Sequence, residues 1–217
     1  YKYLGNWHDR ENNSNIEEKY LHKYLVKKGY SKQLINRAIE MLVNAANNQV
    51  DKLYYVNKEV YSLIRYGARV KENISDNNQT VMFINFKEPY DNDFYIAEEV
   101  SVKGENNKRP DIVLYVNGIA LGVLELKRST VSISEGIRQN LDNQTSNFIK
   151  PFFHTMQIVM AGNDTEGMKY GAIETKEKYY LTWKEDKKAA DELSLKVELL
   201  TNDLDYLLDK QIVGLCH

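Results

Sequence analysis

The sequence predicts an α/β fold in which helices flank a mixed β-sheet. Three observations predict it: helical periodicity fills much of the first 67 residues, β-branched runs with turn signals follow from residue 68, and a capped helix with a further strand comes after residue 132. Helices at the start, then strands, a helix and another strand, are typical of an α/β sandwich around a mixed sheet.

Three helices are expected in the N-terminal part of the chain. Ser14 and Glu17 have the spacing of a capping box, which starts a helix that Gly29 ends. A second helix is expected over 31–46, and a third over 50–67. The residues expected on their apolar faces are Leu34, Ile35, Ala38, Met41, Leu42 and Ala45 in the second helix, and Tyr54, Tyr61 and Ile64 in the third.

From residue 68 the pattern changes to that of strands and turns. Segments 68–70 and 81–86 are expected to pair across a turn at 75–79, and 94–102 is a further strand before a charged loop at 103–108. A hairpin over 111–127 comes next. The elements expected after it are a helix from Ser132 to about Phe148 that Pro151 stops, a strand at 157–161, a hairpin of 170–175 with 179–183, and helix from Lys184 onward.

The stretch 109–127 contains the strongest local signal in the chain. Asn117-Gly118 between two apolar, β-branched runs is typical of a β-hairpin, and the second run is apolar enough for a central strand covered on both faces. Because charged side chains are rarely buried unless they are paired or bind a metal, charges inside such a hairpin indicate a functional site. The three charges are Asp111, Glu125 and Lys127.

The register of this hairpin decides whether Asp111 and Glu125 share a face. A two-residue loop would set Asp111 opposite Leu124, with its side chain on the wrong face. A three-residue loop over 116–118, with its glycine left-handed in a bulge, would set Asp111 opposite Val123 and make Glu125 its diagonal neighbour, with Cβ atoms roughly 7 Å apart. We therefore predict the three-residue, bulged loop.

Two carboxylates and a lysine in this arrangement suit phosphodiester hydrolysis. Hard oxygen ligands such as Asp111 and Glu125 suit Mg²⁺, which keeps several waters and shares its shell with substrate phosphate. Such a metal polarises the phosphate and lowers the pKa of a bound water. Lys127 would orient that water or stabilise charge in the transition state. The alternative is a structural Glu–Lys pair on a sheet face, with Asp111 as a turn cap.

Composition limits the possible functions. With a formal charge of −2 and a pI of about 6.2, the chain has no bulk basic field to hold nucleic acid by itself. Its single cysteine, Cys216, excludes an internal disulfide framework and a cysteine-rich zinc site. Its apolar runs are shorter than the roughly 18 residues of a membrane span, and no signal-peptide pattern is present. We expect a cytoplasmic protein without a membrane partner.

The residues around the three charges resemble a known family. Pro110-Asp111 and Glu125-x-Lys127 are similar to the PD-(D/E)xK nuclease signature, and the longer run 109–128 resembles the N-terminal nuclease domain of the restriction (R) subunit of type I restriction–modification enzymes. The resemblance covers nearly the whole chain. Further similar elements are Asn92-Asp93-Phe94, Gly136-Ile137-Arg138-Gln139-Asn140, Phe152-Phe153 and Ala161-Gly162-Asn163.

This resemblance implies a restriction-endonuclease-like fold and an Mg²⁺-dependent endonuclease that cuts double-stranded DNA after translocation by a helicase-like motor. It implies that Asp111, Glu125 and Lys127 are catalytic, the two carboxylates being the metal ligands. The implied partners are a methyltransferase (M) subunit and a specificity (S) subunit. ATP would bind the motor, because this chain lacks a Walker A pattern.

The same resemblance implies a division of the chain into two parts. A nuclease domain would occupy 1–185, with a helical part over 14–67 and the catalytic sheet over 68–183. A helical linker toward the motor would follow over 186–217.

The family also uses a Gln-x-x-x-Tyr element on the helix after the lysine strand, which this chain matches in part. Gln139 precedes Asn143 and Gln144 precedes Phe148, so neither match supplies the tyrosine hydroxyl. At about 1.5 Å per residue, a helix that starts near Ser132 carries Gln144 roughly 18 Å from its start, against roughly 10 Å for Gln139. Gln144 also falls on the apolar stripe, which favours Gln139.

Other polar residues near the hairpin are candidates for DNA contact or site support, although ordinary surface charge explains the basic ones equally well. They are Gln139, Gln144, Arg128 and Arg138, together with Lys103, Lys108 and Arg109. Glu17, Glu18, Glu98 and Glu99 are expected on solvated surfaces.

Two alternative functions stay open beside the restriction nuclease. The chain would be a nuclease-like domain that only docks DNA or other subunits, or a stand-alone repair or resolvase nuclease.

Overall fold

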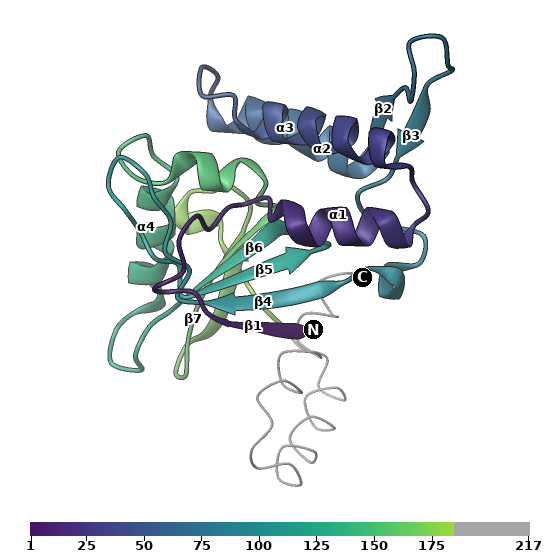
Figure 1. Ribbon diagram of the computed structural model, residues 1–217. Coiled ribbons are helices and arrows are strands. Elements are labelled where there is room, and N and C mark those ends of the chain that lie inside the picture. Colours follow the sequence, from purple (N-terminus) through teal and green to yellow (C-terminus); the bar gives the residue numbers. More distant parts are fainter. Residues whose placement is uncertain (185–217) are drawn as a thin grey trace, which may run out of the picture.

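A seven-stranded mixed β-sheet, flanked by four α-helices, organises the computed structural model, which describes residues 1–184 (Figure 1). The predicted α/β architecture with a mixed sheet is therefore confirmed. In spatial order the strands are β1 (Lys2–Asn6), β4 (Phe94–Glu98), β5 (Ile112–Val116), β6 (Ile119–Leu126), β7 (Ile158–Asn163), β8 (Gly167–Gly171) and β9 (Leu181–Thr182). The pairs β1–β4 and β6–β7 are parallel, and the other neighbours are antiparallel.

Along residues 1–184, three α-helices precede a small two-stranded sheet in the sequence, and a fourth follows it. They are α1 (Glu18–Lys27), α2 (Lys32–Ala46), α3 (Leu53–Tyr66) and α4 (Ile133–Asn143). Between α3 and β4, the strands β2 (Ala68–Val70) and β3 (Gln79–Val81) form an antiparallel pair. Short 3₁₀ turns are η1 (Pro89–Asp91), η2 (Lys150–His154) and η3 (Glu177–Tyr179). The linker predicted over 186–217 lies outside the described residues.

The predicted second and third helices are present, but some of the residues predicted on their buried faces are exposed. The Ser31 hydroxyl accepts a hydrogen bond from the Leu34 N–H at 3.3 Å and caps α2. Met41 is exposed, although the prediction placed it on the apolar stripe. The prediction that Tyr54 and Tyr61 line the inner face of α3 is also wrong, because both are exposed. The buried residues of α3 are Leu53, Val56, Asn57, Val60 and Ile64.

The first helix starts three residues later than its capping-box spacing predicts, with Glu17 rather than Ser14 at its N-cap. The Glu17 side chain does accept from the Ser14 N–H at 3.0 Å, as a capping box requires. However, Ile16 forms a β-bridge with Ile119, and the Glu17 N–H donates to the Gly118 carbonyl at 2.8 Å. These bonds to the hairpin hold the segment extended, so α1 begins at Glu18.

The fourth helix and several strands differ in length from the prediction. α4 ends at Asn143 rather than near Phe148, well before Pro151. The Thr145 hydroxyl donates to the Asp142 carbonyl at 2.8 Å, which gives the backbone an alternative to another helical turn. β4 stops at Glu98 because the next residue has a positive φ of 51°. β3 covers only 79–81, and the last antiparallel pair is 167–171 with 181–182.

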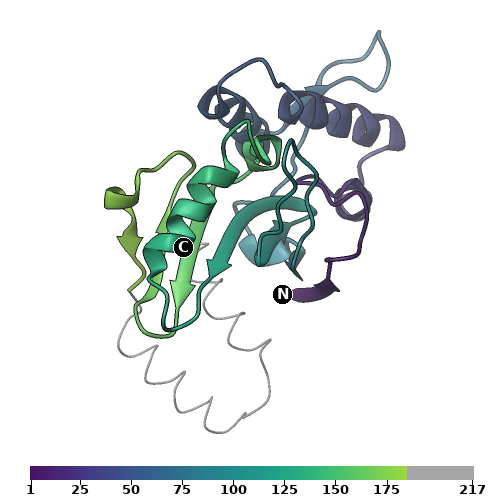
Figure 2. The same ribbon diagram turned by 90° about the vertical axis from the view of Figure 1, so that its left-hand side faces the viewer.

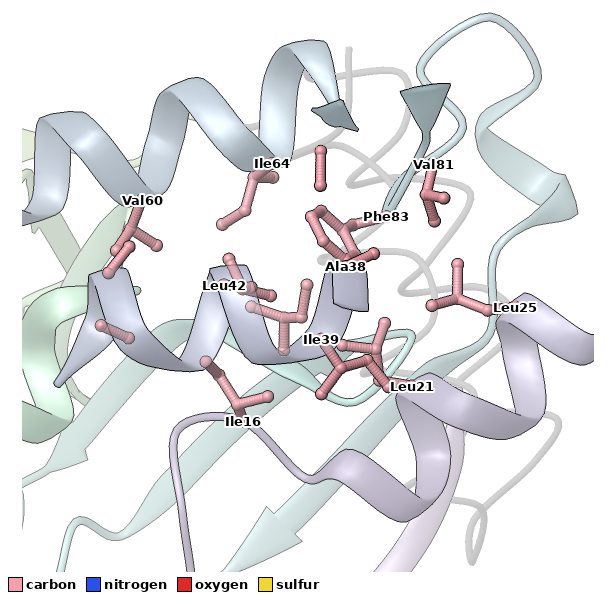
Figure 3. Packing of buried hydrophobic residues seen from close by; sticks show 14 of the residues in the cluster. Ile16, Leu21, Leu25, Ala38, Ile39, Leu42, Val60, Ile64, Val81 and Phe83 are labelled. Carbon is pink, nitrogen blue, oxygen red and sulfur yellow. The ribbon is translucent and has the colours of Figure 1, made fainter. Parts of the chain in front are cut away.

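Two layers of side chains hold the helices and the sheet together. Figure 3 shows α1, α2 and α3 packed through residues such as Leu21, Leu42 and Ile64. One face of the large sheet, including Val123 and Val159, is covered by the segment after β1 and by η2. α4 packs along β7 and β6 on this same face (Figure 2). Together, the segment after β1, η2 and α4 bury the strands that carry the candidate site residues.

Within residues 1–184, every helix is too short or too polar to cross a lipid bilayer.

Gly118 packs directly against the start of α1, so Gly118→Ala is expected to destabilise the fold. A Cβ there would lie 2.7 Å from the Glu17 carbonyl oxygen and 2.8 Å from the Leu21 nitrogen, and φ is +93°. Strain and overpacking together should cost about 3 kcal/mol of the free energy of unfolding, measured by urea denaturation.

The matched control is Gly167→Ala. Gly167 has a φ of +76° with nothing within 4 Å of its Cβ position, so only backbone strain of about 1 kcal/mol is expected. Equal losses for the two variants would contradict the packing argument.

Candidate active site

The turn of the central hairpin differs from the prediction. Val116 pairs directly with Ile119, so the loop has two residues, Asn117 and Gly118, with φ of 53° and 93°. The predicted three-residue loop is therefore wrong. Two left-handed residues in succession are typical of a type I′ turn, which matches the twist of the flanking strands.

Buried polar contacts explain why the two-residue turn forms. The Asn117 side chain is fully buried; its amide donates to the Phe83 carbonyl and to the Asn92 side chain, both at 2.8 Å. Its oxygen accepts from the Asp93 N–H at 2.7 Å. These bonds hold Asn117 in the left-handed conformation, which asparagine tolerates better than most residues.

A bulge further along the hairpin brings Asp111 and Glu125 onto one face. Tyr115 pairs with Ala120, but Leu114 pairs with Gly122, so one extra residue, Leu121, is inserted in β6. From there the register places Ile112 opposite Leu124. The next positions along the two strands are Asp111 and Glu125, which therefore face each other. The shared face was predicted, but from a bulge at a different position.

Glu125 is a carboxylate in an unusually dry position. Its exposed fraction is 0%, and its Oε1 has no hydrogen-bond partner. Burial, and after it the neighbouring Asp111 carboxyl, raise the pKa of Glu125 to about 8, although the charge of Lys127 opposes both effects. Without a cation, burial and Asp111 therefore favour the protonated form of this carboxyl.

Gln139 links Glu125 to Lys127. The Lys127 Nζ donates to Gln139 Oε1 at 2.6 Å, and Gln139 Nε2 donates to Glu125 Oε2 at 2.7 Å. Lys127 Nζ itself lies 3.9 Å from Glu125 Oε2. The sequence favoured Gln139 over Gln144 for a place beside the carboxylates, and the structure puts Gln139 there.

A glycine in α4 allows this helix to lie close to the lysine. A Cβ on Gly136 would lie 3.1 Å from the Ala161 Cβ and 3.4 Å from the Lys127 Cγ. The Ser132 hydroxyl, which accepts from the Ser134 N–H at 3.3 Å, fixes the start of the helix. The helix therefore holds Gln139 in a fixed position beside Lys127.

Asp111 is held by the backbone of the opposite strand. Its Oδ2 accepts from the Leu126 N–H at 2.7 Å, which orients the carboxyl group on the face that it shares with Glu125. The Lys127 N–H donates to the Gly162 carbonyl at 2.9 Å and continues the pairing of β6 with β7. The three charged residues are therefore brought together, and each is positioned by regular structure.

The structure does not bring the other support candidates to these carboxylates. Gln144 is buried at the end of α4, where it donates to the Asn140 carbonyl and accepts from the Glu174 N–H. Arg138 pairs with Glu135 at 2.6 Å on the surface, and this contact raises the pKa of Arg138. Arg128 is exposed and forms no ion pair within residues 1–184.

A polar cleft lies beside the site, and no pattern in the sequence predicted it. It has a volume of about 800 Å³ and is lined by Asp111 and Gln139 together with residues of 8–13 and 101–109. Glu17, expected on a solvated surface, is instead buried and pairs at 2.5 Å with Arg10, which lines the cleft. The two residues are seven positions apart in an irregular segment, so no periodic pattern indicated the pair.

The donor set fits a hard divalent cation. Glu125 Oε1 is a buried oxygen without a partner, and Asp111 contributes a second carboxylate on the same face. Among residues 1–184 no group of three or more His, Cys, Asp or Glu side chains is placed to hold a metal. One or two carboxylates with water and substrate oxygens completing the shell suit Mg²⁺ better than metals that need an all-protein cage.

A family model described as "Type I restriction enzyme R protein N terminus (HSDR_N)" matches residues 1–178. The chain belongs to this family. The resemblance drawn from the hairpin is therefore confirmed, and the mixed sheet flanked by helices is the restriction-endonuclease-like fold that the resemblance implied.

A curated relative from Methanocaldococcus jannaschii agrees with this assignment. Its name is "Putative type I restriction enzyme MjaVIIIP endonuclease subunit", and it is 26% identical over 168 residues. The match covers 75% of this chain and 16% of the relative, so the chain spans about one sixth of that protein's length.

Glu125→Gln is expected to stabilise the metal-free protein increasingly as the pH rises. The pKa of Glu125 is about 8 in the folded chain and about 4.5, its ordinary value, when unfolded. Between these pH values the folded state binds one proton more, so the wild-type free energy of unfolding falls with rising pH. The Glu125→Gln variant has no titrating carboxyl at this position, so its free energy of unfolding does not fall for this reason.

Thermal unfolding in EDTA checks this expectation. The melting temperature of Glu125→Gln should exceed that of wild type by roughly 5 °C at pH 8, and by much less at pH 5. Glu59→Gln, an exposed change of the same kind on α3, should show no growing difference. A constant offset for Glu125→Gln across this range would contradict the assigned burial cost.

Proposed function

We propose that this chain is the Mg²⁺-dependent endonuclease domain of a type I restriction–modification R subunit, and that it hydrolyses DNA phosphodiester bonds after ATP-driven translocation by the rest of the subunit. The observation that carries the proposal is the buried carboxylate of Glu125, whose Oε1 lacks a partner and which faces Asp111. Membership of the R-protein family supports it.

Asp111 and Glu125 would hold the Mg²⁺ ion. When bound, the ion supplies polarisation of the scissile phosphate and a lowered pKa for a coordinated water. The protein's own contribution is a fixed pair of oxygens: Asp111 is oriented by the Leu126 N–H, and Glu125 by the Gln139 amide. Neither side chain has to reorganise before the substrate arrives.

Lys127 is placed to act on the reacting phosphate. Its ammonium group is held by Gln139 Oε1, and the side chain is only 18% exposed, so its charge acts in a partly dry site. There it would orient the attacking water or stabilise the negative charge that develops on the phosphate. Gln139 is a positioning residue, because it acts through Glu125 and Lys127.

The partners of the proposed enzyme follow from its family. Double-stranded DNA is the substrate, and the M and S subunits complete the restriction complex. The recognition sequence would reside on the S subunit, and ATP would bind the motor. We also propose a cytoplasmic location, where this substrate lies. The near-neutral charge of the chain agrees with a domain to which DNA is delivered by other parts.

Asp111→Asn and Lys127→Gln are expected to abolish DNA cleavage by the assembled R, M and S subunits. The loss should be about 100-fold or more, because each change removes a charge that acts on the transition state. ATP hydrolysis should continue, since the motor is untouched. Plasmid linearisation and phosphate release, measured on the same preparation, check the two activities.

Asp142→Asn and Lys23→Gln are matched controls, since both side chains are exposed and make no contact with the site. They should cleave at the wild-type rate. Undiminished cleavage by Asp111→Asn and Lys127→Gln, with ATP hydrolysis intact, would contradict the proposal and favour a docking role.

A further inference from the structure

The polar cleft beside the carboxylates has a fixed wall. The segment 8–13 is tied to the loop after β4, because the Asn13 amide donates to the Ser101 carbonyl at 2.9 Å. The Ser101 hydroxyl in turn donates to the His8 carbonyl at 2.6 Å. The cleft is therefore built from two cross-linked segments, and it opens directly onto Asp111 and Gln139.

Two of the four Lys and Arg side chains that line the cleft already form ion pairs with carboxylates. Arg10 makes a two-pronged contact with Glu17, and its guanidinium lies 3.8 Å from the centre of the Trp7 ring. Arg109 pairs with Glu99 at 2.5 Å. These pairs are part of the wall, and the charge that they offer to a ligand is largely neutralised.

The other two cations, Lys103 and Lys108, form no ion pair within residues 1–184. Lys108 is half-buried, with its Nζ 4.1 Å from the centre of the Phe148 ring. The contact with Phe148 restricts the direction of the ammonium group. Lys108 lines the same cleft as Asp111. Lys103 is exposed in the same cleft.

We propose that this cleft binds the phosphodiester backbone of the substrate DNA next to the scissile phosphate, and that Lys103 and Lys108 make the contacts. The inference rests on the proposed function, because it treats Asp111 as the point at which the strand is cut. An unpaired ammonium beside the reacting group can neutralise a backbone phosphate without competing with a protein carboxylate.

The charge of the cleft explains why such a contact would be weak on its own. Asp9 and Glu11 line it together with Asp111, so its carboxylates nearly balance its cations. Two phosphate contacts would bind free DNA only weakly, and their main effect would be to orient a strand supplied from elsewhere. This role agrees with the overall charge of −2.

The test is the salt dependence of DNA binding by the 217-residue chain in EDTA, where cleavage does not interfere. A fluorescent 20-base-pair duplex is titrated at several salt concentrations, and log Kobs is plotted against log salt. Each phosphate contact contributes about 0.9 to the slope. Lys103→Gln with Lys108→Gln should therefore reduce the slope by about 2 and weaken binding roughly tenfold at low salt.

A control with the same change of net charge separates the cleft from bulk charge. Lys23→Gln with Lys58→Gln removes two exposed lysines on α1 and α3 and should leave the slope within about 0.3 of wild type. Lys108→Arg should keep the wild-type slope, since it preserves the charge.

Three outcomes would overturn the inference. They are an unchanged slope in the cleft variant, an equal reduction in the control, and no binding by the wild-type chain. Because the assay needs no cleavage, a reduced slope together with an inactive nuclease would retain the cleft as a DNA site and reject only the proposed chemistry.

Discussion

The buried carboxylate of Glu125 is the constraint on which the site depends. A carboxylate without exposed surface is costly unless something compensates its charge, and the protein compensates it only in part, through Gln139 and the more distant Lys127. β6 buries the residue by pairing with strands on both sides, and α4 closes over it. The remaining uncompensated oxygen is what a divalent cation would bind.

The second carboxylate reaches this position through two linked irregularities of the hairpin. Asn117 fixes a tight turn by bonds to residues near β3 and β4, and the extra Leu121 in β6 then shifts the register by one residue. Without the bulge, Asp111 would face the other side of the sheet. The Gly118 contact with α1 ties the helical layer to the same hairpin. Fold and site are therefore coupled through one turn.

The sequence predicted the hairpin, the shared face of its charges and the preference for Gln139, because alternation and helical rise act over short distances. The predicted turn type was wrong because the register shift was placed in the loop, whereas the structure has it at the bulge formed by Leu121. The Arg10–Glu17 pair was missed because it lies in irregular structure. Tyr54 and Tyr61 misled the prediction because tyrosine is apolar enough to suit either face of a helix.

The most direct test of this account is the effect of Mg²⁺ on the melting temperature of the 217-residue chain at pH 8. A ligand that binds only the folded state stabilises it, by about 2.7 kcal/mol at one hundred times Kd. The account predicts that the wild-type melting temperature rises with Mg²⁺ concentration, whereas Asp111→Asn and Glu125→Gln gain little. An equal rise in all three proteins, or no rise in the wild type, would contradict a cation site at these carboxylates.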